Sequence, residues 1–202
     1  MNVKPIFIII TFFILLVSCK QTNEQLLDKA FELTKQNKYN KAIEVYTKVI
    51  KSNSKLQLAY YNRGISYVAI KDYPKAYADF NKVMALQTKG GFIFTYNQDS
   101  SFADEEAKAQ IPYNDALYHR AQVKFYMDSI KSSFEDFQTL IARNYEEISN
   151  CLLWQGTICI QSGMTEKACE CFDKAKKIAL IDNDREEADK MIATYCGQTN
   201  HH

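Results

Sequence analysis

Glycine and proline are scarce in this chain of 202 residues, which has only six of the first and three of the second. An all-β fold needs both residues at its many turns, so their scarcity argues against one and favours helices. An excess of charge of one sign is also lacking, since 25 Lys and Arg face 24 Asp and Glu. Nothing in that balance indicates nucleic acid as a partner.

Catalytic and metal-binding motifs are lacking as well. The sequence contains no G-x-x-x-x-G-K-[ST], no G-x-S-x-G and no H-E-x-x-H. The only histidine outside the C-terminal pair is His119, and no motif surrounds it. We interpret it as a surface or hydrogen-bonded residue. The sequence therefore predicts no enzyme, no cofactor and no metal site.

The first twenty residues differ from the rest of the chain. Lys4 precedes a run of 13 residues, 5–17, that is apolar except for Thr11. A membrane-spanning helix needs about 20 apolar residues, so this run is short for a span and suits a signal peptide. Ser18 and Cys19 follow at once, where the polar sequence begins.

The end of that run, LVSC at residues 16–19, resembles a bacterial lipobox. The resemblance implies a lipoprotein: residues 1–18 are removed, Cys19 is acylated and the mature chain stays on the membrane. Loss of Lys4 lowers the formal net charge from +1 to 0. We expect a bacterial membrane, the outer one being favoured, with the protein facing the periplasm or exterior. An uncleaved signal anchor and cleavage without lipid are the alternatives.

Internal repeats dominate the remainder. Residues 23–56 and 57–90 match at an offset of 34, and weaker copies lie at 114–148 and 149–182. Each copy has a small residue near the middle of its first amphipathic segment and an aromatic in the second. In the second copy the shared positions are Gly64, Tyr67, Tyr73, Ala76, Phe80 and Val83. The third copy departs from the pattern at Lys124 and Ile130.

This pattern closely resembles the tetratricopeptide repeat (TPR), whose small residues lie where the two helices of a pair touch. The resemblance implies an all-α fold, a right-handed TPR superhelix of four helix pairs plus a C-terminal capping helix. The predicted helices are 23–36, 39–52, 56–70, 73–87, 113–127, 130–143, 146–161, 164–180 and a cap at 184–195.

The predicted domain organisation follows from these segments. It consists of a signal peptide at 1–18, a lipid-anchored linker at 19–22, the TPR domain at 23–196 and a tail at 197–202. An insert at about 88–112 interrupts the register, because the second and third copies start 57 residues apart. Its apolar residues at 92–96 need cover, either from the solenoid or from a partner.

The resemblance also implies a binding groove on the concave side, lined by the first helix of each pair. Some TPR domains clamp a carboxylate there with Lys and Asn, but the matching positions in the first repeat are Leu27 and Phe31. Apolar and aromatic residues suit an amphipathic helix or an extended peptide. The candidate groove residues are Leu27, Phe31, Tyr61, Ile65, Val68, Tyr118, Gln122, Phe125, Leu153, Thr157 and Ile160.

Five further cysteines lie in the last repeat and its cap. Cys159 occupies a core position and is expected to be a buried thiol. An exported chain meets an oxidising compartment, so a disulfide is possible. Cys169 lies on a helix expected to pack on the cap that contains Cys196, and we favour this pair, with all thiols free as the main alternative.

The leading functional hypothesis is a membrane-anchored scaffold or adaptor of the bacterial cell envelope, with a protein or peptide partner. The alternatives are a periplasmic carrier of an apolar small ligand and an accessory lipoprotein of outer-membrane protein assembly. A pocket under the insert would favour the carrier, whereas a co-purified protein would favour the scaffold.

Overall fold

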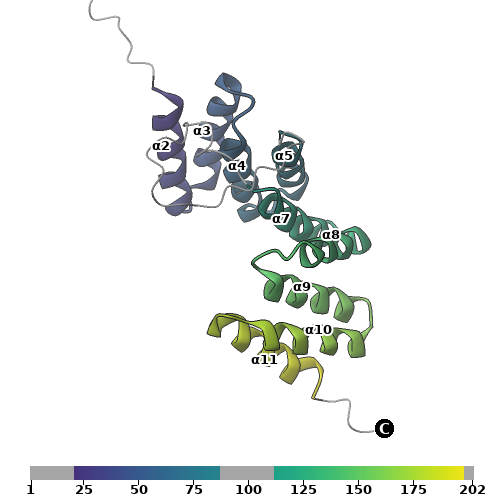
Figure 1. Ribbon diagram of the computed structural model, residues 1–202. Helices are drawn as coiled ribbons and strands as arrows, with labels where there is room; N and C mark the ends of the chain where they lie inside the picture. Colours follow the sequence, from purple (N-terminus) through teal and green to yellow (C-terminus); the bar gives the residue numbers. More distant parts are fainter. Residues whose placement is uncertain (1–20, 87–111, 198–202) are drawn as a thin grey trace, which may run out of the picture.

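The computed structural model describes residues 21–86 and 112–197. Every regular element in these two ranges is a helix, and four pairs are followed by one single helix (Figure 1). The pairs are α2 (Asn23–Lys35) with α3 (Tyr39–Ser52), α4 (Gln57–Ala69) with α5 (Tyr73–Leu86), α7 (Tyr113–Tyr126) with α8 (Ile130–Ala142), and α9 (Ile148–Gln161) with α10 (Thr165–Ile178); the single helix is α11 (Asp182–Tyr195). The predicted helices are confirmed, with every end within two residues. The signal peptide, Cys19, most of the insert and the last five residues lie outside the described ranges.

The first helix begins where its sequence supplies a cap. The Thr22 hydroxyl accepts a hydrogen bond from the Gln25 backbone N–H at 3.2 Å, and the Gln25 side chain accepts one from the Thr22 N–H at 3.1 Å. This reciprocal capping box satisfies two backbone donors that would otherwise lack partners. The helical array therefore starts immediately after the predicted linker.

A small residue in the first helix of each pair allows close approach of the second helix. A Cβ added at Gly64 would lie 3.0 Å from the Phe80 ring, and one at Gly156 would lie 2.6 and 2.7 Å from two atoms of the Phe172 ring. Both rings are fully buried. The repeat pattern thus places an aromatic ring of the second helix against the small residue of the first helix, as the resemblance implied.

The turn inside each pair has the same backbone geometry in all four repeats. One residue in each of these turns adopts a left-handed conformation, with φ between 57° and 73°. The next residue donates its N–H to a carbonyl five positions back, at 2.8–2.9 Å. This is a Schellman closure, which satisfies carbonyls at the helix end. The left-handed residues are Asn37, Lys71, Asp128 and Gly163.

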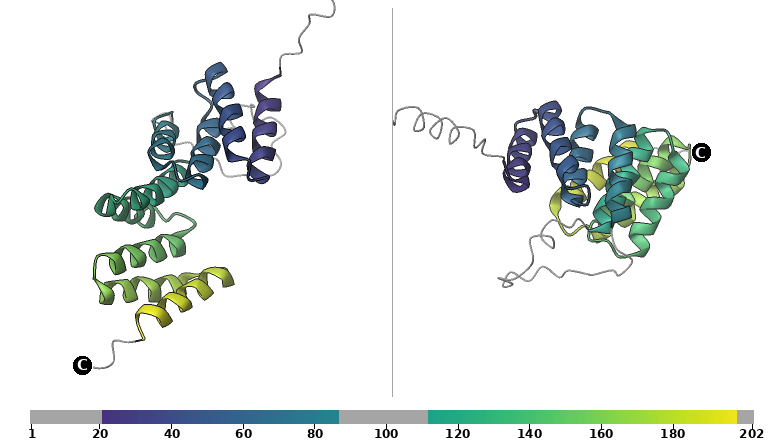
Figure 2. Two further views of the ribbon diagram at one scale, coloured as in Figure 1. Left: turned by 180° about the vertical axis from the view of Figure 1, so that it is seen from behind. Right: turned by 90° about the horizontal axis from the view of Figure 1, so that it is seen from above.

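The array curves toward its first helices. The backbone of each first helix comes close to that of the next first helix, from α2 to α4, α7, α9 and α11, whereas the backbones of second helices in the described ranges do not come as close to one another. Closer spacing on one side of a stack bends it toward that side. The first helices therefore form the concave face of a superhelix, and α3, α5, α8 and α10 form its outer layer (Figures 1 and 2).

The insert does not separate the second and third pairs. Helix α5 packs on α7 just as α3 packs on α4. An arginine bridges both junctions: Arg63 binds Asp79 with two hydrogen bonds, at 2.7 and 2.8 Å, and reaches Thr47 of the preceding pair at 3.1 Å. Arg120 binds Asp136 in the same way, at 2.8 and 3.0 Å, and reaches Asn81 of the preceding pair at 3.1 Å. The bridge is therefore repeated one junction later.

The departure at Lys124 has a physical explanation. Its ammonium lies 2.8 Å from Asp136, which already binds Arg120, and both side chains are largely buried. A cation is tolerated at this core position because a buried carboxylate faces it. Ile130, the other departure, packs partly buried on the cluster around Phe137.

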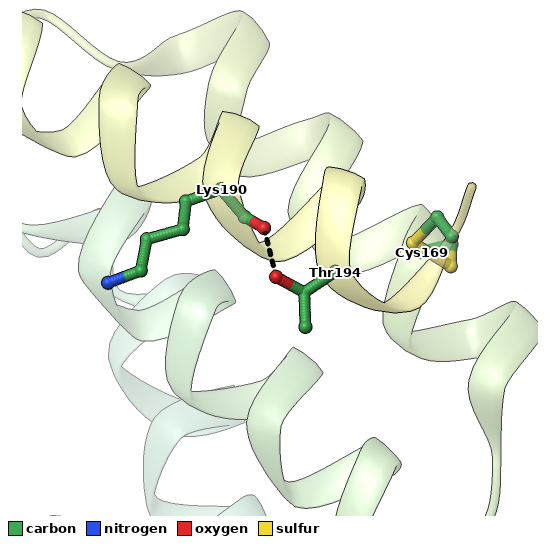
Figure 3. Close-up of a disulfide and its surroundings, with 4 residues drawn as sticks. Cys169, Lys190 and Thr194 are labelled. Carbon is green, nitrogen blue, oxygen red and sulfur yellow. Dashed lines mark hydrogen bonds between the residues drawn. A yellow bond between two sulfur atoms is a disulfide. The ribbon is translucent and has the colours of Figure 1, made fainter. Parts of the chain in front are cut away.

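Helix α11 closes the C-terminal end. Ala188 is fully buried against α9 and α10, and Lys176 of α10 pairs with Asp189 at 2.5 Å. A disulfide joins Cys169 of α10 to Cys196, with Cα atoms 5.8 Å apart (Figure 3). The last repeat is thus fixed to its cap by packing, charge and a covalent bond. Across the two described ranges, helices are all too short or too polar to cross a bilayer.

Candidate protein-binding groove

The concave face is open at its N-terminal end. Phe31 of α2 is 51% exposed, while Leu27, one turn earlier, is half-buried against the cluster of Ala30 and Tyr46. Lys35 lies over the Phe31 ring at 5.5 Å from its centroid and also pairs with Glu32. Phe31 is therefore an accessible aromatic side chain on the predicted groove.

Aromatic rings join the second and third repeats at the centre of this face. Tyr61 of α4 contacts both Phe80 and His119 edge-on, with centroids 5.9 and 5.5 Å apart. Tyr118 of α7 contacts His119 and Phe137 in the same manner. The rings of Tyr61 and Tyr118 are only partly buried, so these two predicted groove residues contribute both to the core and to the surface.

His119 is a structural residue. Its ring stacks on Phe80 at 5.6 Å, and its Nδ1 lies 3.0 Å from the amide oxygen of Gln122. Burial lowers its pKa, although the Gln122 hydrogen bond opposes the shift. The imidazole is therefore neutral at pH 7, and Gln122, a predicted groove residue, is occupied in positioning it.

A second group of rings lies at the C-terminal end of α7. Phe125 contacts Trp154 of α9 at 5.4 Å, and Trp154 stacks on Phe137 at 5.8 Å. Tyr126 stacks on Tyr73 at 5.0 Å and is 47% exposed. Tyr126 is thus a second accessible aromatic, which was not predicted from the sequence. Its position directly after Phe125, on a helix already assigned to the groove, was the available signal.

Leu153 differs from the prediction. It is 8% exposed and belongs to the buried cluster that includes Ala168, Phe172 and Ala188. Helix α11 covers this end of α9, so the position that faces the groove in other repeats is enclosed here. The remaining predicted residues, Ile65, Val68, Thr157 and Ile160, are half-buried. Ile65 and Val68 pack beside Phe80, and Ile160 packs beside the cluster that includes Phe172 and Ala188. The Thr157 hydroxyl donates a hydrogen bond to the Leu153 carbonyl at 2.9 Å.

Two carboxylates lie at the N-terminal ends of neighbouring inner helices. Asp115 is in the first turn of α7 and accepts a hydrogen bond from the Tyr145 hydroxyl at 3.0 Å. Glu147 directly precedes α9 and accepts one from the Asn150 amide at 2.8 Å. Burial raises the pKa of Asp115, and the charge of Glu147 raises it further. Neither residue was predicted from the sequence, because their approach requires the packing of α7 against α9.

The thiols of the last repeat are buried. Cys159 is fully buried, as expected, and Cys151 and Cys171 are buried too. Burial raises the pKa of all three, in Cys151 to about 12. They are therefore protonated and unreactive at neutral pH. Between residues 21 and 86 and between 112 and 197, no group of three or more His, Cys, Asp or Glu side chains is arranged to hold a metal ion.

Comparisons with known proteins agree with this geometry. Residues 32–71 match the family described as TPR repeat, and residues 149–182 match the family described as tetratricopeptide repeat. No curated protein sequence matches the chain at a significant level. The chain therefore contains tetratricopeptide repeats, and its all-helical superhelix is of the TPR class.

Solved structures show the same fold at low sequence identity. MamA from Desulfovibrio magneticus RS-1 has a TM-score of 0.59 at 13% identity, covering 86% of this chain and 93% of that one. YrrB, described as a TPR protein with an unusual peptide-binding site, has a TM-score of 0.56 at 18% identity, covering 88% and 87%. A putative kinesin light chain of Podosopora anserina has a TM-score of 0.62 at 11% identity, covering 85% and 84%. At these identities the likeness establishes the fold alone.

Proposed function

We propose that this protein is a non-catalytic adaptor that binds a peptide segment of another protein on its concave face while a lipid on Cys19 tethers it to a bacterial membrane. The observation that supports binding is the pair of accessible aromatic side chains, Phe31 and Tyr126, on two inner helices. Exposed aromatics of this kind are typical anchors at protein interfaces. The peptide-binding site of YrrB gives a precedent on the same fold.

The lipid anchor rests on the sequence at residues 16–19. One acyl chain binds membranes reversibly, and stable attachment needs a second signal or chain. A lipoprotein with a multiply acylated cysteine meets that requirement. The tether would place the N-terminal end of the superhelix toward the membrane, since α2 begins four residues after Cys19. The outer membrane, with the groove in the periplasm or exterior, is the proposed location.

The apolar-ligand carrier stays an alternative, because the insert at about 88–112, under which its pocket was expected, lies almost wholly outside the described residues. A hollow described at the α7–α8 turn is lined by Asp128, Ser129, Lys131, Ser132 and Glu135 together with Ile130. A lining of this polarity does not suit an apolar molecule.

Site-specific photo-cross-linking in intact cells tests the binding role. A photoreactive amino acid at position 31 or 126 should yield a discrete protein adduct. The same residue at position 164 is the matched control, because Met164 is exposed to a similar degree but lies in the α9–α10 turn. Equal adducts at all three positions, or none, would contradict a partner on the concave face.

Membrane fractionation tests the tether. Cys19→Ala should abolish incorporation of labelled palmitate and release the protein into the soluble fraction. Cys196→Ser is the control, since it also removes a cysteine but leaves the lipobox intact. Unchanged membrane retention of the Cys19→Ala protein would reject the lipid anchor.

A further inference from the structure

One edge of the concave face, at the N-terminal ends of α7 and α9, contains two carboxylates without a positive partner among the described residues. Asp115 and Glu147 accept hydrogen bonds only from the neutral groups of Tyr145 and Asn150. Neither carboxylate belongs to any of the ion pairs found in the described ranges. Helix dipoles stabilise carboxylates at such positions, but they do not neutralise a pair that repels itself across two helices.

The Lys and Arg side chains of the inner helices α4 and α7 are held elsewhere. Arg63 is paired with Asp79, and both Arg120 and Lys124 are paired with Asp136, at the junctions between repeats. All three cations are largely buried there. They are thus withheld from the groove. Arg143, directly after α8, lies over the Tyr113 ring at 4.7 Å and is not in any of the ion pairs of the described ranges, so it does not neutralise either acid.

Several rings respond to the same uncompensated charge. Burial raises the pKa of Tyr145, and the charges of Asp115 and Glu147 raise it further. The pKa of Tyr61 is raised by the same causes in the same order. The two carboxylates, Tyr61 and Tyr145 therefore share one region that favours a positive charge, in agreement with the hydrogen bond from Tyr145 to Asp115.

The aromatic rings suit a cation as well. The faces of Tyr and Trp attract ammonium and guanidinium groups. Tyr61 and Tyr118 both contact the His119 ring. Tyr118 also contacts Tyr145, with ring centroids 5.8 Å apart. A basic side chain placed there would meet both carboxylates and ring faces.

Apolar surface lies at the opposite edge of the same helix. Asp115 and Tyr126 are 11 residues apart on α7, which corresponds to about 16 Å along the helix axis. This distance accommodates one peptide, either helical or extended, lying across the inner helices. Such a peptide would meet acids on one side and Phe125 and Tyr126 on the other.

We infer that the partner is basic: the groove binds a peptide segment in which Lys or Arg side chains meet Asp115 and Glu147 while apolar side chains of the same segment pack on Phe125 and Tyr126. This inference rests on the proposed function and adds the chemistry of the partner. The charge that this groove binds is opposite to the charge bound by a carboxylate clamp, which binds acidic chain ends. The mature chain has a formal net charge of 0, so this selectivity is a property of the groove and not of the whole surface.

Fluorescence anisotropy with defined peptides tests the inference on the full-length chain in detergent. The probes are three short amphipathic peptides of one length that combine leucine with lysine, glutamine or glutamate. The lysine peptide should bind most tightly, and its affinity should fall as salt is raised. Asp115→Asn with Glu147→Gln should weaken it about tenfold, since a partly buried charge contact at Asp115 and an exposed one at Glu147 are lost.

The control is Glu44→Gln with Glu135→Gln, which removes the same charge from exposed positions on the outer helices α3 and α8. It should leave affinity within about twofold, because screened distant charges contribute little. Circular dichroism melting checks that the groove variant is folded. The amide oxygen that Asp115→Asn introduces can still accept the Tyr145 hydrogen bond, so the fold should be retained.

The outcomes separate the two proposals. If the glutamine or glutamate peptide binds as tightly and Phe31→Ala with Tyr126→Ala weakens it, the basic partner is wrong while groove binding holds. An equal loss in the groove variant and the outer control would also overturn the basic partner. If none of the three peptides responds to the Phe31 and Tyr126 substitutions, the proposed function fails along with the inference.

Discussion

The first and last helix pairs follow one repeat pattern, yet their inner faces are covered differently. In the first pair, α2 contacts only α3 and α4 within the described ranges, and Leu27 is half-buried. In the last pair, α9 contacts α7, α8, α10 and α11, and Leu153 is buried. A position in the repeat therefore does not decide exposure by itself. The number of neighbouring helices decides it.

The disulfide should give the largest difference between the two ends. Cys169→Ser with Cys196→Ser opens a loop with a sequence separation of 27, which corresponds to about 3.5 kcal/mol on the chain-entropy model. Hydrogen exchange should become faster in α10 and α11 and stay unchanged in α2 and α3. Faster exchange at both ends would show that the whole array unfolds as one unit.

Truncating the equivalent leucines should separate the ends next. Leu153→Ala removes a buried side chain and should lower the free energy of unfolding by about 3 kcal/mol. Leu27→Ala, at the matching position of the open pair, should cost about 1 kcal/mol because the side chain is only half-buried. Urea denaturation measures both. Equal losses would mean that α11 does not enclose Leu153.

The glycines at the small position should differ as well. Gly156→Ala places a methyl group against the buried Phe172 ring and should cost about 2 kcal/mol through overpacking. Gly64→Ala meets Phe80 at 3.0 Å, a contact that a small ring shift relieves, while alanine favours the helix by about 1 kcal/mol. Its net effect should be near zero. Thermal melting of the two variants compares their stabilities. A larger loss of stability in Gly64→Ala than in Gly156→Ala would show that the helices of the second pair are packed more tightly than those of the fourth.

The smallest expected effect concerns pH at the centre of the array. Since burial lowers the pKa of His119 below 6.5, the unfolded chain binds more protons just below that pH. Stability is therefore present above pH 6.5 and falls as pH drops through it, by at most about 1.4 kcal/mol per pH unit.

His119→Phe keeps a stacking ring and should remove this contribution. Denaturation at several pH values between neutrality and mild acid measures it. Asp79 and Asp115 have pKa values raised above their ordinary value of 3.8, so their contribution to stability falls as pH rises above 3.8, opposite to that of His119. Both carboxylates are present in the two proteins, so their contribution cancels in the comparison. An unchanged pH slope in the variant would assign the effect to other groups.

The helices could be predicted from sequence because their signals are local. Thr22 with Gln25 starts α2, and the left-handed residues Asn37, Lys71, Asp128 and Gly163 follow the ends of α2, α4, α7 and α9. The spacing of Gly64 and Phe80 likewise predicts a contact within one repeat. These features involve residues that are close in the chain, so the pattern is read directly from it.

The covering of each groove position could not be predicted in this way. Leu153 and Leu27 occupy equivalent positions, and only the docking of α11 distinguishes them. The approach of Asp115 to Glu147 and the stacking of His119 on Phe80 likewise depend on how successive pairs are rotated. Sequence alone thus determined the repeats, their helices and the positions available to a groove. The tertiary structure decided which of those positions remain exposed, because burial and charge pairing depend on neighbours that are distant in the chain.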